Sequence, residues 1–234
     1  MKKIAIIGGG NLGAAIAEGL LKSKFSKASE ITVTRRNTSV NPLKPLGIDI
    51  ISDNNAAVKR SDVVILAVKP FQTIELLKTI KKDISPGKIL ISVVTGVTLH
   101  EIETAIEKKI SLFRAMPNTA ISIQQSMTCL CHLHTREEDV KFVEELFNKL
   151  GKVVFIDEKL GEFIRHLLCN QWVMRRECDS ERGDFVVTSL HKVNPYSLAH
   201  CLNFLFGAGW RFIPFKKMQL VSDGQETRTA ENLL

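Results

Sequence analysis

A short apolar stretch near the start of the chain runs directly into a glycine-rich turn. Residues 4–7 read Ile-Ala-Ile-Ile, and Gly8, Gly10 and Gly13 follow with G-x-G-x-x-G spacing before a run of small residues at 14–17. In a strand–turn–helix unit the first glycine permits the tight turn, the second lets a pyrophosphate approach the backbone, and the third lets the helix pack on the strand. Free N–H groups at the start of the helix then bind the phosphates. The pattern predicts a dinucleotide site; the alternative is a glycine-rich turn that binds no ligand.

The end of the second expected strand, residues 30–34, indicates which dinucleotide would bind. Arg35, Arg36 and Asn37 follow this strand, and no acidic residue stands there. An acidic residue at this place binds the ribose of NAD, whereas arginine accommodates the 2′-phosphate of NADP. Planar guanidinium groups match phosphate geometry. The sequence therefore favours NADP(H), with NAD(H) as the second candidate; the alternative is that both arginines belong to a solvated loop.

Length and composition limit the classes of protein to which this chain can belong. The chain has 234 residues, a formal charge of +7 and five cysteines at uneven spacing. This length can bury a substantial core, and the odd cysteine number favours reduced thiols over a disulfide framework. The longest apolar runs, such as 63–68, have strand length, and no signal peptide is recognisable. We therefore expect a cytoplasmic protein without a membrane segment. Its scattered lysines suit anionic small molecules better than nucleic acid.

Strands alternate with helices along the first two thirds of the chain. Further strands are expected at 47–51, 63–68, 89–94 and 110–115, and helices at 54–59, 71–82, 99–106 and 137–150. Thr98 with Glu101, and Thr135 with Glu138, match the capping-box pattern at two helix starts. The alternation predicts an α/β fold with a doubly wound, Rossmann-type parallel sheet. Such sheets bind ligands at the carboxyl ends of their strands.

A cluster of cysteine and histidine at 129–134 raises the question of a metal site. Thiolates and imidazoles are zinc ligands. On a strand, however, Cys129 and Cys131 would face one side while His132 and His134 face the other. We therefore expect a strand with buried cysteines and no metal site.

Three loops together carry a family resemblance. The segments Gly-Gly-Gly-Asn-Leu-Gly at 8–13, Ala-Val-Lys-Pro at 67–70 and Arg-Ala-Met-Pro-Asn-Thr at 114–119 closely resemble pyrroline-5-carboxylate reductase. The resemblance implies hydride transfer from NAD(P)H to the carbon–nitrogen double bond of 1-pyrroline-5-carboxylate, a cyclic imine, giving L-proline. It implies no particular catalytic residue here.

The resemblance also assigns residues to the two ligands. The implied cofactor-binding residues are Gly8, Gly10, Asn11, Leu12, Gly13, Arg35, Arg36, Asn37, Asn54, Ala67, Val68, Lys69, Pro70, Thr95 and Gly96, with Asn54 over the adenosine and the last six on the nicotinamide side. The implied substrate-side residues are Met116, Asn118 and Thr119. Read singly, Lys69-Pro70 could merely end a strand, and Asn118 could be a turn residue.

The resemblance stops at about residue 160. Residues 1–160 hold 18 lysines, 5 arginines and 20 isoleucines, whereas 161–234 hold 3, 6 and 2. The family continues into a helical domain that pairs subunits into homo-oligomers and completes the substrate pocket, and none of its motifs is recognisable here. We expect an NAD(P)-binding domain at 1–160, followed by an atypical, poorly folding segment at 161–234. A shift of reading frame near residue 160 and a divergent C-terminal domain are the two interpretations.

Three functions follow from these observations. The first is an NADP-linked imine reductase of proline biosynthesis. A hydroxyacid dehydrogenase on the same scaffold would need a catalytic lysine on a helix of a second domain, and no such helix is identifiable. The third is a catalytically inactive dinucleotide-binding remnant, which the unfamiliar segment after residue 160 favours.

Overall fold

An eight-stranded sheet forms the centre of the computed structural model, which describes residues 2–38, 43–117 and 119–158. The strand order is β3-β2-β1-β4-β5-β6-β7-β8, and β1 to β6 are parallel. β7 runs antiparallel to β6, and β8 runs parallel to β7. The strands are β1 (Ile4–Ile7), β2 (Ile31–Thr34), β3 (Asp49–Ile51), β4 (Val63–Leu66), β5 (Ile89–Ser92), β6 (Ser111–Met116), β7 (Ser126–Leu133) and β8 (Gly151–Phe155). The predictions for residues 161–234 and the boundary after residue 160 lie outside the described residues.

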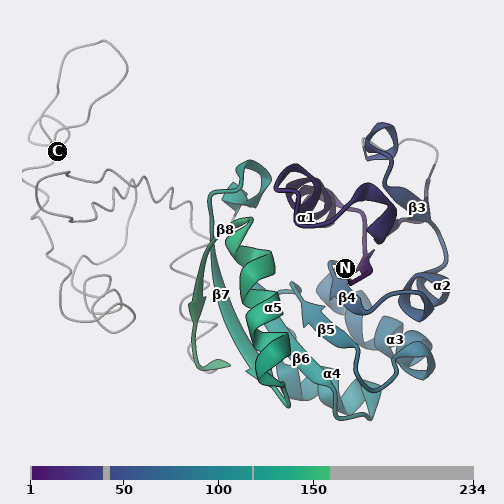
Figure 1. The fold of residues 1–234 in the computed structure, drawn as a ribbon. Helices are drawn as coiled ribbons and strands as arrows, with labels where there is room; N and C mark the ends of the chain where they lie inside the picture. Colours follow the sequence, from purple (N-terminus) through teal and green to yellow (C-terminus); the bar gives the residue numbers. More distant parts are fainter. Residues whose placement is uncertain (1, 39–42, 118, 159–234) are drawn as a thin grey trace, which may run out of the picture. The chain divides into compact units, whose positions relative to one another are not determined.

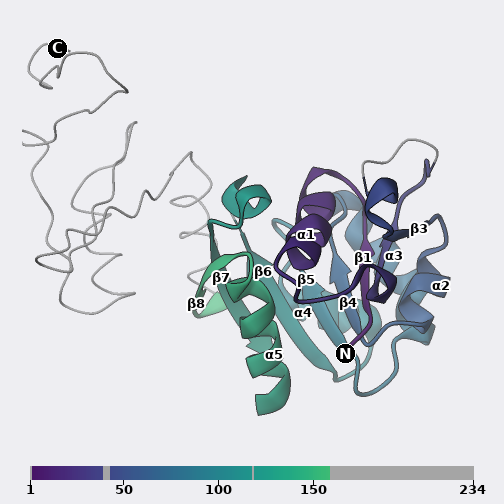
Figure 2. The same ribbon diagram turned by 45° about the horizontal axis from the view of Figure 1, so that its top comes forward.

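Helices cover both faces of this sheet (Figure 1). One face carries α1 (Asn11–Lys22) and α5 (Glu137–Asn148), and the other carries α2 (Asn54–Lys59), α3 (Pro70–Ile80) and α4 (Leu99–Ile106). Figure 2 shows the same two layers from another angle. The remaining elements are four short 3-10 helices: η1 (Ala28–Glu30), η2 (Lys44–Leu46), η3 (Lys81–Asp83) and η4 (Thr119–Ile123). The predicted doubly wound parallel sheet is confirmed.

The alternation of side chains along the strands builds two separate cores. In β1, Ile4 and Ile6 pack toward α1 and α5, while Ala5 and Ile7 pack toward α2, α3 and α4. All four residues are buried. A strand covered on both faces has no solvent side, which explains why its sequence is apolar without interruption. Among the described residues, no helix is both long and apolar enough to cross a bilayer.

The predicted elements agree with the structure most closely where a cap or a proline marks a helix end. α2 and α4 have the expected bounds, and α3 begins at Pro70, one residue earlier than expected. Proline suits the first helical position because its missing N–H has no partner there anyway. β4 and β5 end two residues earlier than expected, at Leu66 and Ser92. The apolar runs continue beyond these ends because the first loop residues are still partly or wholly buried.

The start of α5 differs from the predicted capping box. Arg136 rather than Thr135 is the N-cap residue, and no side chain caps this helix. The Thr135 hydroxyl instead lies 2.7 Å from His132 Nδ1, and the Arg136 guanidinium donates to the buried carboxylate of Asp139. The predicted capping box does not form, because Thr135 contacts β7 and Arg136 forms an ion pair with Asp139 within the first turn.

The sequence did not reveal that β7 is antiparallel or that β8 exists. Gly151, which opens β8, has a φ of +150°, and a Cβ there would lie 1.9 Å from the carbonyl oxygen of Ser126. Ser126 donates its N–H to the carbonyl oxygen of Leu150 at 3.0 Å. This close backbone contact between the start of β8 and the start of β7 places β8 at the sheet edge, and it joins Gly151 to a residue 25 positions earlier.

We predict that the α4 cap stabilises the fold measurably. Thr98 Oγ1 accepts from the N–H of Glu101 at 3.2 Å, and the Glu101 carboxylate accepts from the N–H of Thr98 at 2.7 Å. Thr98→Ala should lower the free energy of unfolding by about 1 kcal/mol, measured by urea denaturation. Thr135→Ala is the control, because Thr135 caps nothing; an equal loss in both variants would contradict the assignment.

Candidate functional site

The carboxyl ends of the parallel strands meet at one edge of the sheet. Ile7 is in register with both Thr34 and Leu66, Leu66 with Ser92, and Ser92 with Arg114. The segments that follow these residues therefore leave the sheet side by side. They hold the glycine turn at 8–13, the arginines at 35–36, the segments 67–70 and 93–98, and residues 116 and 117. The fold thus gathers at one edge the loops that carry the sequence motifs.

The strand order reverses between β1 and β4, and an open α/β sheet has a crevice at the carboxyl edge where such a reversal occurs. After β1 the chain continues into α1 on one face, and after β4 it continues into α3 on the other. In open α/β sheets such a reversal is the place where ligands bind.

The three motif glycines have distinct steric environments. Gly8 has a φ of +112°, and a Cβ on it would lie 2.5 Å from the carbonyl oxygen of Ala67. A Cβ on Gly13 would lie 2.1 Å from the carbonyl oxygen of Gly8. Gly10 is different, because a Cβ there would meet nothing within 4 Å. The turn and the helix contact therefore require Gly8 and Gly13, while Gly10 leaves open space beside the backbone. This is the arrangement that a close-lying phosphate needs.

Backbone hydrogen bonds hold the turn against its neighbours. Gly9 donates its N–H to the carbonyl oxygen of Thr34 at 2.7 Å, and the N–H of Gly8 lies 3.3 Å from Thr34 Oγ1. Ala67 donates to the carbonyl oxygen of Ile7 at 2.8 Å. Gly10 is the N-cap of α1, so no side chain caps this helix. The amino end of α1 thus has a fixed position in the crevice and can offer N–H groups to an anion.

The predicted adenosine-side residues lie after β2 and at the start of α2. Arg35, Arg36 and Asn37 are exposed, and Arg35 is tied to β3 because its N–H donates to the carbonyl oxygen of Ile51 at 2.9 Å. Asn54 is half-buried and opens α2. Asp53, the residue before Asn54, caps α2 by accepting from the N–H of Ala56 at 3.0 Å.

The predicted nicotinamide-side residues lie on two loops of the same edge. Ala67 and Val68 are half-buried, whereas Lys69 and Pro70 are exposed at the start of α3. The other loop holds two exposed residues, Thr95 and Gly96, and Gly96 has a left-handed φ of +73°.

Of the predicted substrate-side residues, Met116 is buried at the end of β6 and Thr119 is the first residue of η4. Asn118 lies outside the described residues. The ligand contacts of all these residues stay predictions.

The cysteine–histidine cluster at 129–134 has a structural explanation. Cys129 and Cys131 are buried in β7, and burial raises the pKa of the Cys131 thiol to about 12. The His132 ring contacts Phe113 and Phe155, on the face opposite to Cys131. Among the described residues no three His, Cys, Asp or Glu side chains lie where they could hold a metal ion.

The expectation that His134 faces the same side as His132 is wrong. β7 ends at Leu133, and His134 follows with a left-handed φ of 54°. Its Nε2 lies 2.6 Å from Glu103 Oε1 of α4, on the cysteine side of the sheet. The strand alternation no longer applies once the chain has turned out of the sheet.

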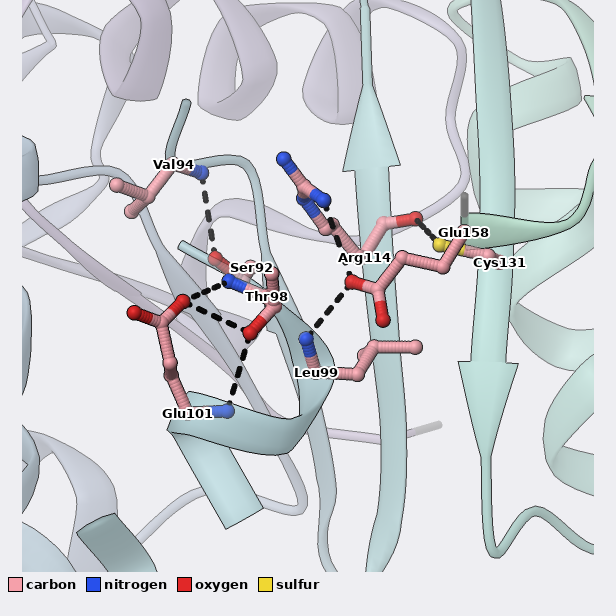
Figure 3. Close-up of polar contacts among 8 residues, drawn as sticks. All are labelled: Ser92, Val94, Thr98, Leu99, Glu101, Arg114, Cys131 and Glu158. Carbon is pink, nitrogen blue, oxygen red and sulfur yellow. Dashed lines mark hydrogen bonds and ion pairs between the residues drawn. The ribbon is translucent and has the colours of Figure 1, made fainter. Parts of the chain in front are cut away.

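Sequence reasoning missed one polar contact at this edge. Arg114 is fully buried in β6, and its guanidinium lies 3.2 Å from Glu158, 44 residues further along the chain (Figure 3). The signal in the sequence was a single charged residue inside an otherwise apolar strand, because such a residue needs a partner. The identity of that partner was not visible from the sequence.

We predict that alanine at two of the glycines lowers the free energy of unfolding by very different amounts. Gly13→Ala should lower the free energy of unfolding by about 3 kcal/mol or more, because its Cβ overlaps a backbone oxygen that cannot move freely. Gly10→Ala should cost less than about 1 kcal/mol, because its site is open. Thermal and urea unfolding of the two variants would check this, and equal destabilisation would contradict the steric assignment.

Comparison with known proteins supports the resemblance over the described region. Residues 3–96 match the family model described as NADP oxidoreductase, coenzyme F420-dependent. Pyrroline-5-carboxylate reductase 1 of Dictyostelium discoideum is 38% identical over 169 residues, which are 67% of this chain and 31% of that protein.

Solved structures give the same fold. A pyrroline-5-carboxylate reductase of Coxiella burnetii is 29% identical with a TM-score of 0.68, covering 72% of this chain and 64% of that one. The Plasmodium falciparum pyrroline carboxylate reductase with NADP bound is 23% identical with a TM-score of 0.66, covering 71% of this chain and 62% of that one.

This chain spans less than two thirds of the length of each of these relatives. The two solved structures nevertheless cover 71% and 72% of this chain, and the matched residues 3–96 include the glycine turn and the loops at 67–70 and 95–96. The described part of the chain is thus similar in sequence and in fold to the pyrroline-5-carboxylate reductases.

Proposed function

We propose that this chain reduces 1-pyrroline-5-carboxylate to L-proline with NADPH as the hydride donor. The observation that carries the proposal is the open space that Gly10 leaves beside the amino end of α1, at the reversal of the strand order between β1 and β4. NADPH, when bound, supplies the hydride. The protein's part is to hold the nicotinamide and the imine carbon in contact and to exclude competing reactions.

The cofactor would lie across the crevice with its phosphates at the start of α1. Asn11, Leu12 and Gly13 provide the first N–H groups of that helix, where the helix dipole favours an anion. Arg35 and Arg36 supply exposed guanidinium groups for the 2′-phosphate. The nicotinamide would reach the loops at 67–70 and 95–96, and the substrate would lie beside Met116 and residues 118–119.

A second candidate function is dinucleotide binding without catalysis. The observation that favours it is the break near residue 160, where the resemblance and the composition both change. A sheet with its carboxyl-edge loops can bind a dinucleotide, but the family's substrate pocket also needs the helical domain. The two candidates share the cofactor site and differ only in turnover.

Purified full-length protein can distinguish the two functions. We expect NADPH to bind, and the fluorescence of its nicotinamide would measure this binding. We also expect NADPH to be oxidised when 1-pyrroline-5-carboxylate is added, with L-proline as the product. Binding without proline formation would support the inactive dinucleotide-binding protein instead. A chain that bound neither NADPH nor NADH would contradict both proposals.

The arginines after β2 should determine the preference for the 2′-phosphate. We predict that replacing Arg35 and Arg36 together by alanine weakens NADPH binding by about 10- to 100-fold, since charge-assisted hydrogen bonds to phosphate are lost. NADH binding should change by less than about threefold, because NADH has no 2′-phosphate. Arg60→Ala is the matched control, because Arg60 is an exposed arginine in an ion pair with Asp49. Equal losses for both dinucleotides would show that the arginines do not bind the 2′-phosphate.

A further inference from the structure

A buried positive charge lies directly beneath the loops of the proposed site. The Arg114 side chain is 1% exposed, within a strand whose six residues are all buried. Arg114 is in register with Ser92 of β5 and with Cys131 of β7. It follows Leu112 by two residues and so lies on the sheet face that α4 covers. Two residues after Arg114 the strand ends at Met116.

One carboxylate oxygen connects this arginine to the start of α4. Glu158 Oε1 lies 3.2 Å from Arg114 Nη1 and accepts from the N–H of Leu99 at 2.8 Å. Leu99 is the first residue of α4. Figure 3 shows the Glu158 side chain reaching both groups at once. A carboxylate is doubly favoured here, by the guanidinium and by the positive end of the helix dipole.

The contact fixes one end of the loop that the proposed function places against the nicotinamide. Residues 93–98 join β5 to α4, and Thr95 and Gly96 are at the exposed tip. At the β5 end, the N–H of Val94 lies 3.3 Å from Ser92 Oγ. At the α4 end, Thr98 and Glu101 form the capping box, and Glu158 accepts from the next N–H along the chain. The loop tip itself remains exposed between two held ends.

The same contact governs the end of β6. A buried guanidinium without a counter-charge is costly, and removing one partner of such a pair destabilises the conformation that buries the other. Glu158 therefore ties two loops of the site together: the loop before α4 through Leu99, and the substrate-side end of β6 through Arg114. The half-buried Glu158 side chain, 26% exposed, lies at the boundary between this core and an open cavity of about 860 Å³.

We propose that Glu158 is a positioning residue that sets the relative placement of the nicotinamide-side loop and the end of β6. It touches neither ligand and acts through Arg114 and the start of α4. This inference rests on the proposed function, since that function assigns the two loops to cofactor and substrate. The same cavity is also lined by Asp157, Glu103 and Lys109 and by three histidines, His100, His132 and His134.

The variants Glu158→Gln and Glu158→Ala separate charge from hydrogen bonding. The glutamine oxygen can still accept from Leu99 but no longer neutralises Arg114, whereas alanine removes both contacts. Glu107→Gln is the control, because Glu107 is an exposed carboxylate at the far end of α4, in an ion pair with Lys81. Circular dichroism of each variant verifies that the sheet has formed.

Hydrogen exchange tests the contact without any ligand. We expect the amides of residues 93–99 to exchange at least about tenfold faster in Glu158→Ala than in the wild type, with a smaller increase in Glu158→Gln. Amides around the glycine turn should exchange at unchanged rates. Unchanged exchange at 93–99 in both variants would overturn the proposal.

Two ligands then test the positioning role. NADPH reaches the nicotinamide-side loop, whereas 2′-phospho-ADP-ribose ends before it. In Glu158→Ala we expect NADPH to bind about five- to tenfold more weakly while the fragment binds within about twofold of wild type. Turnover should fall about tenfold in kcat, with a smaller change in the KM for NADPH. If the binding of both ligands were weakened equally, Glu158 would have only a general structural role, and the proposal would be overturned.

The failure of the proposed function would be recognisable separately. If the wild type bound NADPH but formed no proline, the exchange and ligand comparisons would still decide the role of Glu158. If the wild type bound neither ligand, the proposed function would fall and the positioning role with it, whereas the exchange rates would still report whether Glu158 orders the loop.

Discussion

The contact between the start of α1 and the end of β1 is the constraint on which the candidate site depends. The Gly8 carbonyl oxygen lies so close to Gly13 that a Cβ there would approach to 2.1 Å. Gly8 itself is pressed against the Ala67 carbonyl group and has a φ of +112°. Backbone packed this tightly admits no side chain, so the position and direction of α1 are fixed by glycine alone. Gly10 lies between these two tightly packed glycines and has open space beside it.

The parallel sheet then places the other loops of the candidate site beside the glycine turn. Because β1, β2, β4, β5 and β6 share one register, each of their following loops emerges at the same edge. Helices that leave toward opposite faces open the crevice between β1 and β4. The apolar character of the strands follows from the same architecture, since both faces are covered. The parallel register of the strands therefore determines both the fold and the position of the site loops. A change in the register of one central strand would displace these loops from each other.

The buried Arg114 is the exception to this apolar interior. Its guanidinium forms an ion pair with Glu158, and the same carboxylate oxygen accepts the first N–H of α4. Buried ion pairs add little to stability compared with apolar packing, but they specify one arrangement because each partner is costly alone. The contact lies at the end of the loop 93–98 and two residues before the end of β6 at Met116. An interior charge at this place holds loops in position where apolar packing alone would let them shift.

The sequence by itself determined the features that depend on near neighbours. The glycine turn, the α4 capping box formed by Thr98 and Glu101, and the proline at the start of α3 each specify backbone geometry within a few residues. The uninterrupted apolar strands, together with the helices between them, were enough to predict a doubly wound sheet.

Only the tertiary structure decided the features that depend on distant residues. Four features join residues 13 to 44 positions apart: the antiparallel course of β7, the edge strand β8 held by Gly151 against Ser126, the contact of His134 with Glu103, and the Glu158 partner of Arg114. The sequence shows that a buried arginine needs a carboxylate and that an edge strand needs a neighbour. Which carboxylate and which neighbour depends on how the whole sheet folds, because many distant residues could satisfy the same local requirement.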